Sequence, residues 1–130
     1  MEFKSDLDEE NELREGLSRR VDADAKRMQR FLDMPDLSRQ NNNPLKEIVD
    51  RALRVPSLAN FDIIQIPEIV PVDILFDLFN MPVGHPARSK SDTYYVDEQN
   101  VLRTHDTIFW YYYLNAPEIK KRIEKGETFG

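Results

Sequence analysis

Both histidines of this 130-residue chain lie in one polar stretch, HPARSKSDTYYVDEQNVLRTH, which covers residues 85 to 105. Near its end, Arg103 and His105 alternate along a strand-like segment, so we expect their side chains to point to the same face. An arginine fork can hold a carboxylate or a phosphate in two directions, a histidine can donate a hydrogen bond, and Thr107 adds a hydroxyl. Beside the aromatic residues that follow, such a set could bind the carboxylate and the amine of a small zwitterion.

A structural role explains the same residues and is the more common one. Arg103 could pair with Asp92 or Asp97, and His105 could cap the helix that follows it. The aromatic run FWYYY, residues 109 to 113, is more often a core or interface wall than a ligand pocket. At this point both interpretations stay open.

The HPAR tetrapeptide, residues 85 to 88, raises the same choice. His85 and Arg88 could belong to a site. They could also only hold the loop in shape, with Pro86 stiffening the turn and Arg88 bound to a backbone carbonyl or to an acid such as Asp92.

Composition excludes several classes of function. There is no cysteine, so disulfides, thiolate catalysis and cysteine-based zinc sites are ruled out, and two histidines twenty residues apart make no metal site. Only four glycines are present, with no phosphate-cradling motif, and the net charge of −6 argues against non-specific nucleic-acid binding by the whole chain. No apolar run is long enough for a signal core or a membrane span, so we expect a cytoplasmic protein without a membrane partner.

Residues 1 to 43 are predicted to form a helical arm and a linker. One helix is expected from 6 to 34, after a frayed start, because apolar residues recur there at three- and four-residue steps. Acidic residues crowd its first turns and basic ones gather later, which complements the helix dipole. The helix could be a solvated arm, or it could rest on the rest of the protein or on another chain. The asparagine-rich run before Pro44 reads as the linker.

Residues 44 to 130 show a mixed pattern that predicts an α+β fold. We expect the helix that starts at Pro44 to bury Leu45, Ile48, Val49, Ala52 and Leu53. A strand is expected over 61–66, interrupted at Pro67, followed by a short helix over 72–79 and a loop over 80–91. A hairpin of 92–96 with 100–104 comes next. Two helices are expected at the end, one over 106–114 capped by Asp106 or Thr107, and a last one from Pro117 that stops at Gly126.

Several ordered motifs in this second part resemble one family. HPAR, followed by SDTYYV and then LRTH, resembles the catalytic domain of the alpha chain of phenylalanyl-tRNA synthetase, a class II aminoacyl-tRNA synthetase. Upstream, PLKEIVDRAL, FDIIQIPEI and FDLFNMPVGHPAR agree with the helix, strand and loop segments that the family shows in that order. The resemblance covers residues 44 to 130. It implies part of the class II antiparallel sheet with flanking helices, preceded here by an N-terminal helix.

The resemblance also implies roles for particular residues. His105 falls on the histidine that helps to hold the substrate phenylalanine, and Thr107 stands where the family has a serine that hydrogen-bonds the amino acid. Arg103, His85 and Arg88 are expected to shape this pocket.

Three further positions are placed by the resemblance. Pro67 falls on the proline of the first class II signature, at the subunit interface. Ser91 stands where some members carry a pocket tryptophan, and Asp106 replaces a neutral threonine, so both positions depart from the family pattern.

The function implied is attachment of phenylalanine to tRNA(Phe) with ATP and Mg²⁺, with a synthetase beta chain or a second alpha chain as partner. The arginines of the second and third signatures, which hold the ATP phosphates, lie beyond residue 130, so no catalytic residue is expected within this chain. We therefore expect a fragment that is inactive alone. The alternative is a non-catalytic, synthetase-like interaction module whose class II dimer surface docks a partner.

Overall fold

The computed structural model describes residues 1–128 and combines helices with two small sheets, which confirms the α+β class. Strand β1 (Glu2–Lys4) pairs in parallel with β2 (Ile63–Gln65), and β3 (Ile69–Pro71) pairs antiparallel with β4 (Asn100–Leu102). The prediction that the chain starts frayed is therefore wrong. The second residue pair of the parallel ladder joins Phe3 to Ile64, and Phe3 is buried.

The N-terminal segment forms two helices where a single one was predicted. Helix α1 (Asp8–Ser18) ends before a break, and α2 (Ala23–Leu32) starts anew. The second start has a cap, because the Asp22 carboxylate accepts a hydrogen bond of 2.9 Å from the Ala25 N–H. Val21, which the predicted stripe would have buried, lies in the break and is 84% exposed.

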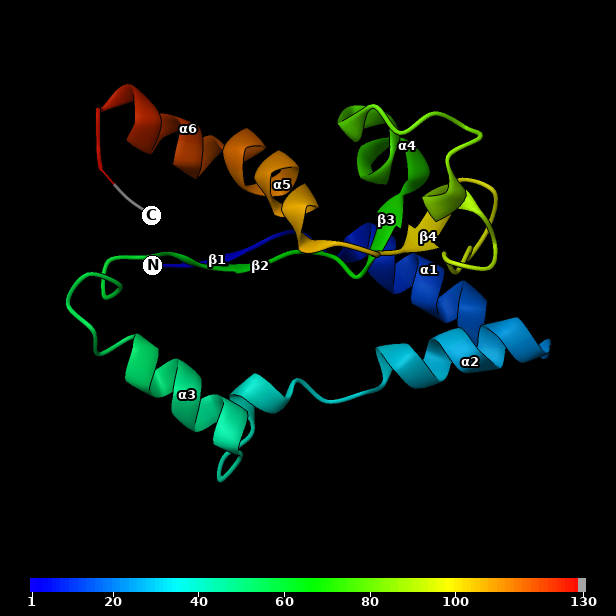
Figure 1. Ribbon diagram of the computed structural model, residues 1–130, viewed down its shortest axis with the longest axis horizontal. Coiled ribbons are helices and arrows are strands. Elements are labelled where there is room, and N and C mark those ends of the chain that lie inside the picture. Colours follow the sequence, from blue (N-terminus) through cyan, green and yellow to red (C-terminus); the bar gives the residue numbers. More distant parts are fainter. Residues whose placement is uncertain (129–130) are drawn as a thin grey trace.

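The two N-terminal helices pack on the antiparallel strand pair. Leu17 of α1 and Met28 of α2 are fully buried in a cluster with Ile69 and Val96. In Figure 1, α1 lies beside β3 and β4, and α2 lies next to α1. Of the placements left open by the sequence, the structure shows the helices resting on the same chain.

Helix α3 (Pro44–Ala52) has the predicted start but not the predicted burial. The Asn43 side chain caps it by accepting from the Leu45 N–H at 3.0 Å, and Pro44 occupies its first turn. None of its residues is buried, and Ile48 is 62% exposed, so the expected buried face is wrong. The helix packs mainly on the short 3-10 turn η1 (Leu37–Arg39) and stands apart from the other helices in Figure 1.

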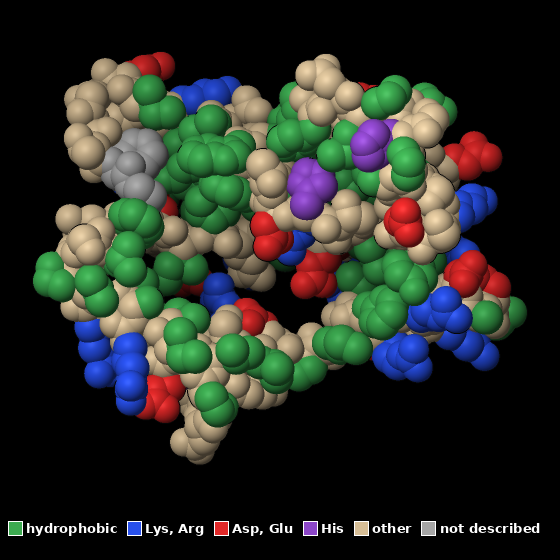
Figure 2. Space-filling model, in the orientation of Figure 1, with side chains coloured by type: hydrophobic (Ala, Val, Ile, Leu, Met, Phe, Trp, Pro, Cys, Tyr) green, Lys and Arg blue, Asp and Glu red, His purple; other side chains and the backbone are tan. Residues whose placement is uncertain are grey.

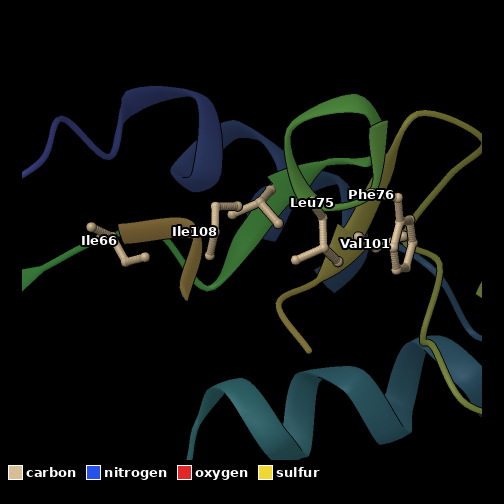
Figure 3. Close-up of a cluster of buried hydrophobic side chains, with 6 residues drawn as sticks. Ile66, Leu75, Phe76, Val101 and Ile108 are labelled. Atoms are coloured by element: carbon tan, nitrogen blue, oxygen red, sulfur yellow. The ribbon is translucent and has the colours of Figure 1, made fainter. Parts of the chain in front are cut away.

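The main core lies around the antiparallel strands. Helix α4 (Val72–Leu75) and the 3-10 turns η2 (Asp77–Phe79) and η3 (Pro86–Arg88) follow β3. Figure 3 shows the core side chains Ile66, Leu75, Phe76, Val101 and Ile108, of which all but Ile66 are fully buried. Leu75 and Phe76, where α4 passes into η2, both belong to this core, so packing fixes that segment.

The predicted hairpin is present. The N–H of Leu102 donates to the Tyr94 carbonyl at 2.9 Å, and the N–H of Val96 donates to the Asn100 carbonyl at 2.8 Å. The turn is held by the Asp97 carboxylate, which accepts from two backbone N–H groups at 2.7 and 2.8 Å.

The C-terminal part turns from the 3-10 turn η4 (Asp106–Ile108) into α5 (Phe109–Asn115) and α6 (Pro117–Glu124). Neither Asp106 nor Thr107 caps a helix through its side chain, so that prediction is wrong. Gly126 follows α6 with φ of 69°, as expected for a helix stop. Across residues 1–128, no helix has the length and apolarity needed to cross a bilayer.

Candidate functional site

The HPAR turn is anchored by its arginine. Arg88 Nη1 donates to Asp77 Oδ1 at 2.6 Å and to the Met81 carbonyl at 2.9 Å, and the guanidinium lies 5.1 Å from the centre of the Phe76 ring. The side chain is only 11% exposed. Both kinds of partner expected for a structural role are therefore present, a backbone carbonyl and an acid, but the acid is Asp77 rather than Asp92.

His85 begins the same turn. It is the N-cap residue that precedes η3, and its Nδ1 accepts from the Ala87 N–H at 3.1 Å. Because Nδ1 accepts, the neutral ring carries its proton on Nε2. His85 thus shapes the loop through a local hydrogen bond, as Arg88 does through longer ones.

His105 is packed against the α4–η2 segment. Its Nε2 lies 3.2 Å from the Leu75 carbonyl, and its ring meets the Phe79 ring edge-on with centroids 5.1 Å apart. A carbonyl only accepts, so Nε2 is the protonated nitrogen and Nδ1 is left as an acceptor. Nδ1 is buried and has no hydrogen-bond partner among residues 1–128. The imidazole therefore neither caps the next helix nor points into bulk water.

The two histidine-bearing stretches meet on one scaffold. Arg88 contacts Phe76, Asp77 and Met81, while His105 contacts Leu75 and Phe79. Residues 75–81 therefore hold both ends of the motif that sequence reasoning singled out.

Arg103 and Thr107 are not drawn into this scaffold. Arg103 Nη1 pairs with Asp106 Oδ1 at 2.6 Å, rather than with Asp92 or Asp97, and the Asp106 side chain is 90% exposed. Thr107 is exposed. The structure thus brings together only part of the set of side chains that was predicted to bind a small zwitterion.

Beside Arg103 runs a wide groove between the N-terminal helices, the linker and β2. Its volume is about 660 Å³. Figure 2 shows the molecule hollowed near its centre. Glu10, Arg14 and Glu68 line it with Arg103, so both acids and bases lie on its wall.

Ser91 lies away from the hydrogen bonds that anchor Arg88 and His105 to residues 75–81, since its own bonds go to Ser89 and Asp92. It is exposed and lines a groove of about 380 Å³ together with residues of α2. Its hydroxyl lies 2.7 Å from that of Ser89. The aromatic pair Phe109 and Trp110 stacks at 4.5 Å between centroids, and Trp110 remains half exposed.

Pro67 is buried within this chain, in the turn between β2 and β3. The next residue is held by a carboxylate from α1, because Glu10 Oε2 accepts from the Glu68 N–H at 2.8 Å. Glu10 is 4% exposed and also accepts from Arg14 at 2.7 Å. Burial, ahead of nearby charges, raises the pKa of Tyr112 to about 12 in the small cavity that Pro67 and Glu10 line.

A second buried carboxylate joins β2 to the C-terminal helices. The Asp62 side chain is 1% exposed and accepts from Tyr113, from Arg122 at 2.5 Å and from the N-terminal ammonium at 2.8 Å. Burial acts to raise the pKa of Asp62, but these hydrogen bonds outweigh it and lower the pKa to about 2. Burial, with the Asp62 carboxylate beside it, raises the pKa of Tyr113 to about 12.

Sequence reasoning missed both buried carboxylates. Glu10 carried no signal, because it sits among several acidic residues in the first turns of its helix. Asp62 did carry one, since it is a charge inside the apolar run that includes Phe61 and Ile63. Within residues 1–128 no group of three His, Asp or Glu residues is placed to hold a metal ion.

Comparison with known proteins places these features in a family. Residues 27–129 match the family model described as "tRNA synthetases class II core domain (F)". The chain is 40% identical over 72 residues to the "Phenylalanine--tRNA ligase alpha subunit" of Mycoplasmoides gallisepticum, covering 55% of this chain and 21% of that protein. It is 32% identical over 108 residues to the protein of the same name from Syntrophotalea carbinolica, covering 80% and 32%.

A third protein of that name, from Teredinibacter turnerae, is 44% identical over 63 residues, which cover 48% of this chain and 19% of that protein. The chain thus spans between a fifth and a third of the length of these curated relatives. No solved structure matches it significantly.

Proposed function

Since this chain belongs to the class II tRNA synthetase core family, we propose that it forms part of a phenylalanine–tRNA ligase alpha subunit. In this proposal the whole enzyme attaches phenylalanine to tRNA(Phe) with ATP, in the cytoplasm and with a beta chain or a second alpha chain. The observation that carries it is the meeting of the HPAR and LRTH stretches on residues 75–81.

The proposed share of this chain is one wall of the amino-acid pocket. His105 and Thr107 contact phenylalanine, and His85, Arg88, Arg103 and Ser91 shape the wall. The unpartnered Nδ1 of His105 supports this role. An acceptor buried without a donor costs about 1–3 kcal/mol, so a substrate group that donates to Nδ1 regains that energy.

The other parts of the proposal follow from the family. The proposal assigns Pro67, in the buried turn between β2 and β3, to the signature segment near the subunit interface, and has the class II antiparallel sheet extend the β3–β4 pair. The residues described here do not fit Mg²⁺, because they include no cluster of carboxylates for it. The proposal therefore assigns the binding of ATP and Mg²⁺ mainly to other parts of the enzyme, and it gives this chain no part in the chemical step.

The test is a titration of the isotopically labelled chain with L-phenylalanine, followed by NMR at the two histidine rings. Saturable shifts at His105, larger than those at His85, are expected. Thr107→Val should weaken them, and L-leucine should give smaller ones. Equal responses to both amino acids, or no response at His105 at millimolar L-phenylalanine, would remove the support for this wall. Pyrophosphate exchange dependent on phenylalanine is not expected from the isolated chain.

A second candidate function is the non-catalytic interaction module. The exposed apolar side chains favour it, notably Ile48 of α3 at 62% and Trp110 of α5 at 50%. Under this reading L-phenylalanine has no effect at His105, while sedimentation velocity shows association that Ile48→Lys abolishes.

A further inference from the structure

The segment from Phe76 to Met81 is a closed turn. The N–H of Met81 donates to the Phe76 carbonyl at 3.0 Å, and the N–H of Asn80 donates to the Asp77 carbonyl at 3.0 Å. Asn80 takes the left-handed backbone conformation, with φ of 56°. These two bonds and that conformation are the features of a Schellman motif, which satisfies the last carbonyls of a helix. The backbone of this turn is therefore defined by its own hydrogen bonds.

Arg88 bridges the two ends of this turn. Its Nη1 lies 2.6 Å from Asp77 Oδ1 at the start of η2 and 2.9 Å from the Met81 carbonyl just beyond its end. The guanidinium also lies over the ring of Phe76, which is fully buried in the core that Figure 3 shows. One planar, delocalised group thus contacts three points of the turn, which the single ammonium of a lysine could not do in the same way.

The turn and the residue before it present two groups to His105. Leu75 ends helix α4, where carbonyls lack the partner that a further helical turn would supply, and its carbonyl lies 3.2 Å from His105 Nε2. The Phe79 ring lies on the turn that Arg88 bridges, and it meets the imidazole at 87° with centroids 5.1 Å apart. The imidazole therefore cannot turn over about its Cβ–Cγ bond without losing both contacts.

The orientation of the imidazole decides what its second nitrogen can do. While the Leu75 carbonyl accepts from Nε2 of His105, the neutral ring carries no proton on Nδ1, so Nδ1 can only accept. This Nδ1 is buried and has no hydrogen-bond partner among residues 1–128. The contacts on one side of the ring thus keep an acceptor available on the other side.

We propose that Arg88 is a positioning residue for His105. By bridging the ends of the turn, it holds Phe79 and the Leu75 carbonyl against the imidazole, and this contact keeps Nδ1 as an acceptor for a ligand that carries an N–H group. Arg88 itself touches no ligand. The inference rests on the proposed function only in identifying that ligand as the α-ammonium of phenylalanine, because the orientation of the ring is a property of the free chain.

The test observes the ring nitrogens of the ¹⁵N-histidine-labelled chain by NMR without ligand, at pH 8.5, where an ordinary imidazole is neutral. The nitrogen shifts give the ratio of the Nε2–H to the Nδ1–H tautomer. In the unchanged chain we expect His105 to carry its proton on Nε2. Phe79→Leu should lower the ratio at His105 about tenfold, the factor that corresponds to one lost hydrogen bond. Asp77→Ala should act in the same direction but less strongly, because Arg88 keeps the Met81 carbonyl.

Two controls separate positioning from a general loss of structure. Asp73→Ala is matched to Asp77→Ala, because both are exposed acids of the same segment and the Asp73 carboxylate bonds to the Ile74 N–H rather than to Arg88. It should leave the His105 signals in place. His85 is a reference within the spectrum of Phe79→Leu, since its Nδ1 is held by the N–H of its own turn.

An Arg88–Asp77 pair that only stabilises the fold gives a different pattern. Asp77→Ala would then lower Tm, while the His105 signals of the folded chain stayed unchanged, and this result would overturn the proposal. Equal changes in Asp77→Ala and Asp73→Ala, or a proton on Nδ1 of His105 in the unchanged chain, would overturn it as well. Arg88→Lys, which keeps the charge but loses the planar fork, should shift the ratio as Asp77→Ala does.

Added L-phenylalanine separates this inference from the proposed function. If the variants shift the tautomer ratio as expected and L-phenylalanine has no effect at His105, the proposed function fails and the positioning role stands. If L-phenylalanine gives saturable shifts at His105 but the ratio is the same in Phe79→Leu and Asp77→Ala as in the unchanged chain, this inference alone fails. Circular dichroism of each variant checks that the fold is kept.

Discussion

The contact between Glu10 and the turn after Pro67 makes a sharp prediction about stability. We expect Glu10→Ala to lower the free energy of unfolding by about 2–3 kcal/mol. The carboxylate is 4% exposed and accepts from the Glu68 N–H at 2.8 Å and from Arg14 at 2.7 Å. A hydrogen bond to a charged group contributes about 1.5–3 kcal/mol to stability.

Two facts set the upper limit of this loss. The Arg14 side chain is 33% exposed, and it keeps two other partners, Glu68 Oε2 at 3.0 Å and the Leu32 carbonyl at 3.3 Å. Water and these acceptors therefore replace much of the interaction that Arg14 loses with Glu10. The loss in free energy of unfolding stays below the 3–5 kcal/mol typical of a broken buried ion pair.

Thermal unfolding followed by circular dichroism is the assay. At about 4 °C per kcal/mol for a domain of this size, Tm should fall by about 8–12 °C. Glu9→Ala is the matched control, because the adjacent exposed glutamate sits in the same first turn and has the same charge and helix propensity. It should change stability by less than about 0.5 kcal/mol. If the two variants unfold within 2 °C of each other, α1 is not clamped to the turn by this carboxylate.

Three further predictions test the core, the second carboxylate and the exposed helix. The pKa of Asp62 is lowered to about 2 from an ordinary 3.8, so its charge contributes stability that is fully present above pH 4 and is lost as the pH falls toward 2. Asp62→Asn should therefore lower the free energy of unfolding by about 2 kcal/mol at pH 7 and flatten its decline below pH 4, as measured by urea unfolding at several pH values. Phe76→Ala should cost about 3–5 kcal/mol, because the ring is fully buried, whereas Val83→Ala, at 83% exposed, should be neutral in the same titration. Ile48→Lys should leave the Tm of a dilute monomer unchanged within about 2 °C, and a large drop would show that α3 is covered within the chain.

Much of the fold could be predicted because its local signals agree with its packing. The hairpin at 92–104 has an Asp-led turn between two β-branched or aromatic segments, and the segments pair, although only Asn100–Leu102 forms a strand and Tyr95 pairs with Val101 as an isolated bridge. The last helix begins at Pro117 and stops before Gly126, as the positional preferences of these residues require. In both places a residue type dictates the backbone, so no long-range contact was needed to find it.

The errors come from contacts between distant residues. Periodicity alone continued one helix through Arg19–Asp22, where the capping carboxylate and the bond from Arg20 to Val96 end it. Periodicity also indicated a buried face on α3, but an apolar stripe shows only that a helix has such a face, not that something covers it. The strand at residues 2–4 has no signal of its own, because three residues are too short for an alternation pattern.

The candidate site follows the same rule. Its residue types pointed to the right stretches, since Arg88 and His105 both reach residues 75–81. The hydrogen-bond partners of Arg88 and His105 could not be predicted from the sequence, because Asp77 and the Leu75 carbonyl belong to a segment whose position depends on the core. Arg103, placed by alternation beside His105, pairs with Asp106 instead.

The parallel pairing of β1 with β2 has a consequence for the order in which the chain can fold. Phe3 meets Ile64, sixty-one positions later, and closing a loop of that length costs about 4 kcal/mol of chain entropy before any contact repays it. At ribosomal speeds of about 5–20 residues per second, the first strand waits roughly 3–12 s for its neighbour to be made. The earliest residues to be synthesised thus settle only after about half of the chain has been made, and until then the backbone groups of β1 have no partner from β2 and are open to pairing with another chain.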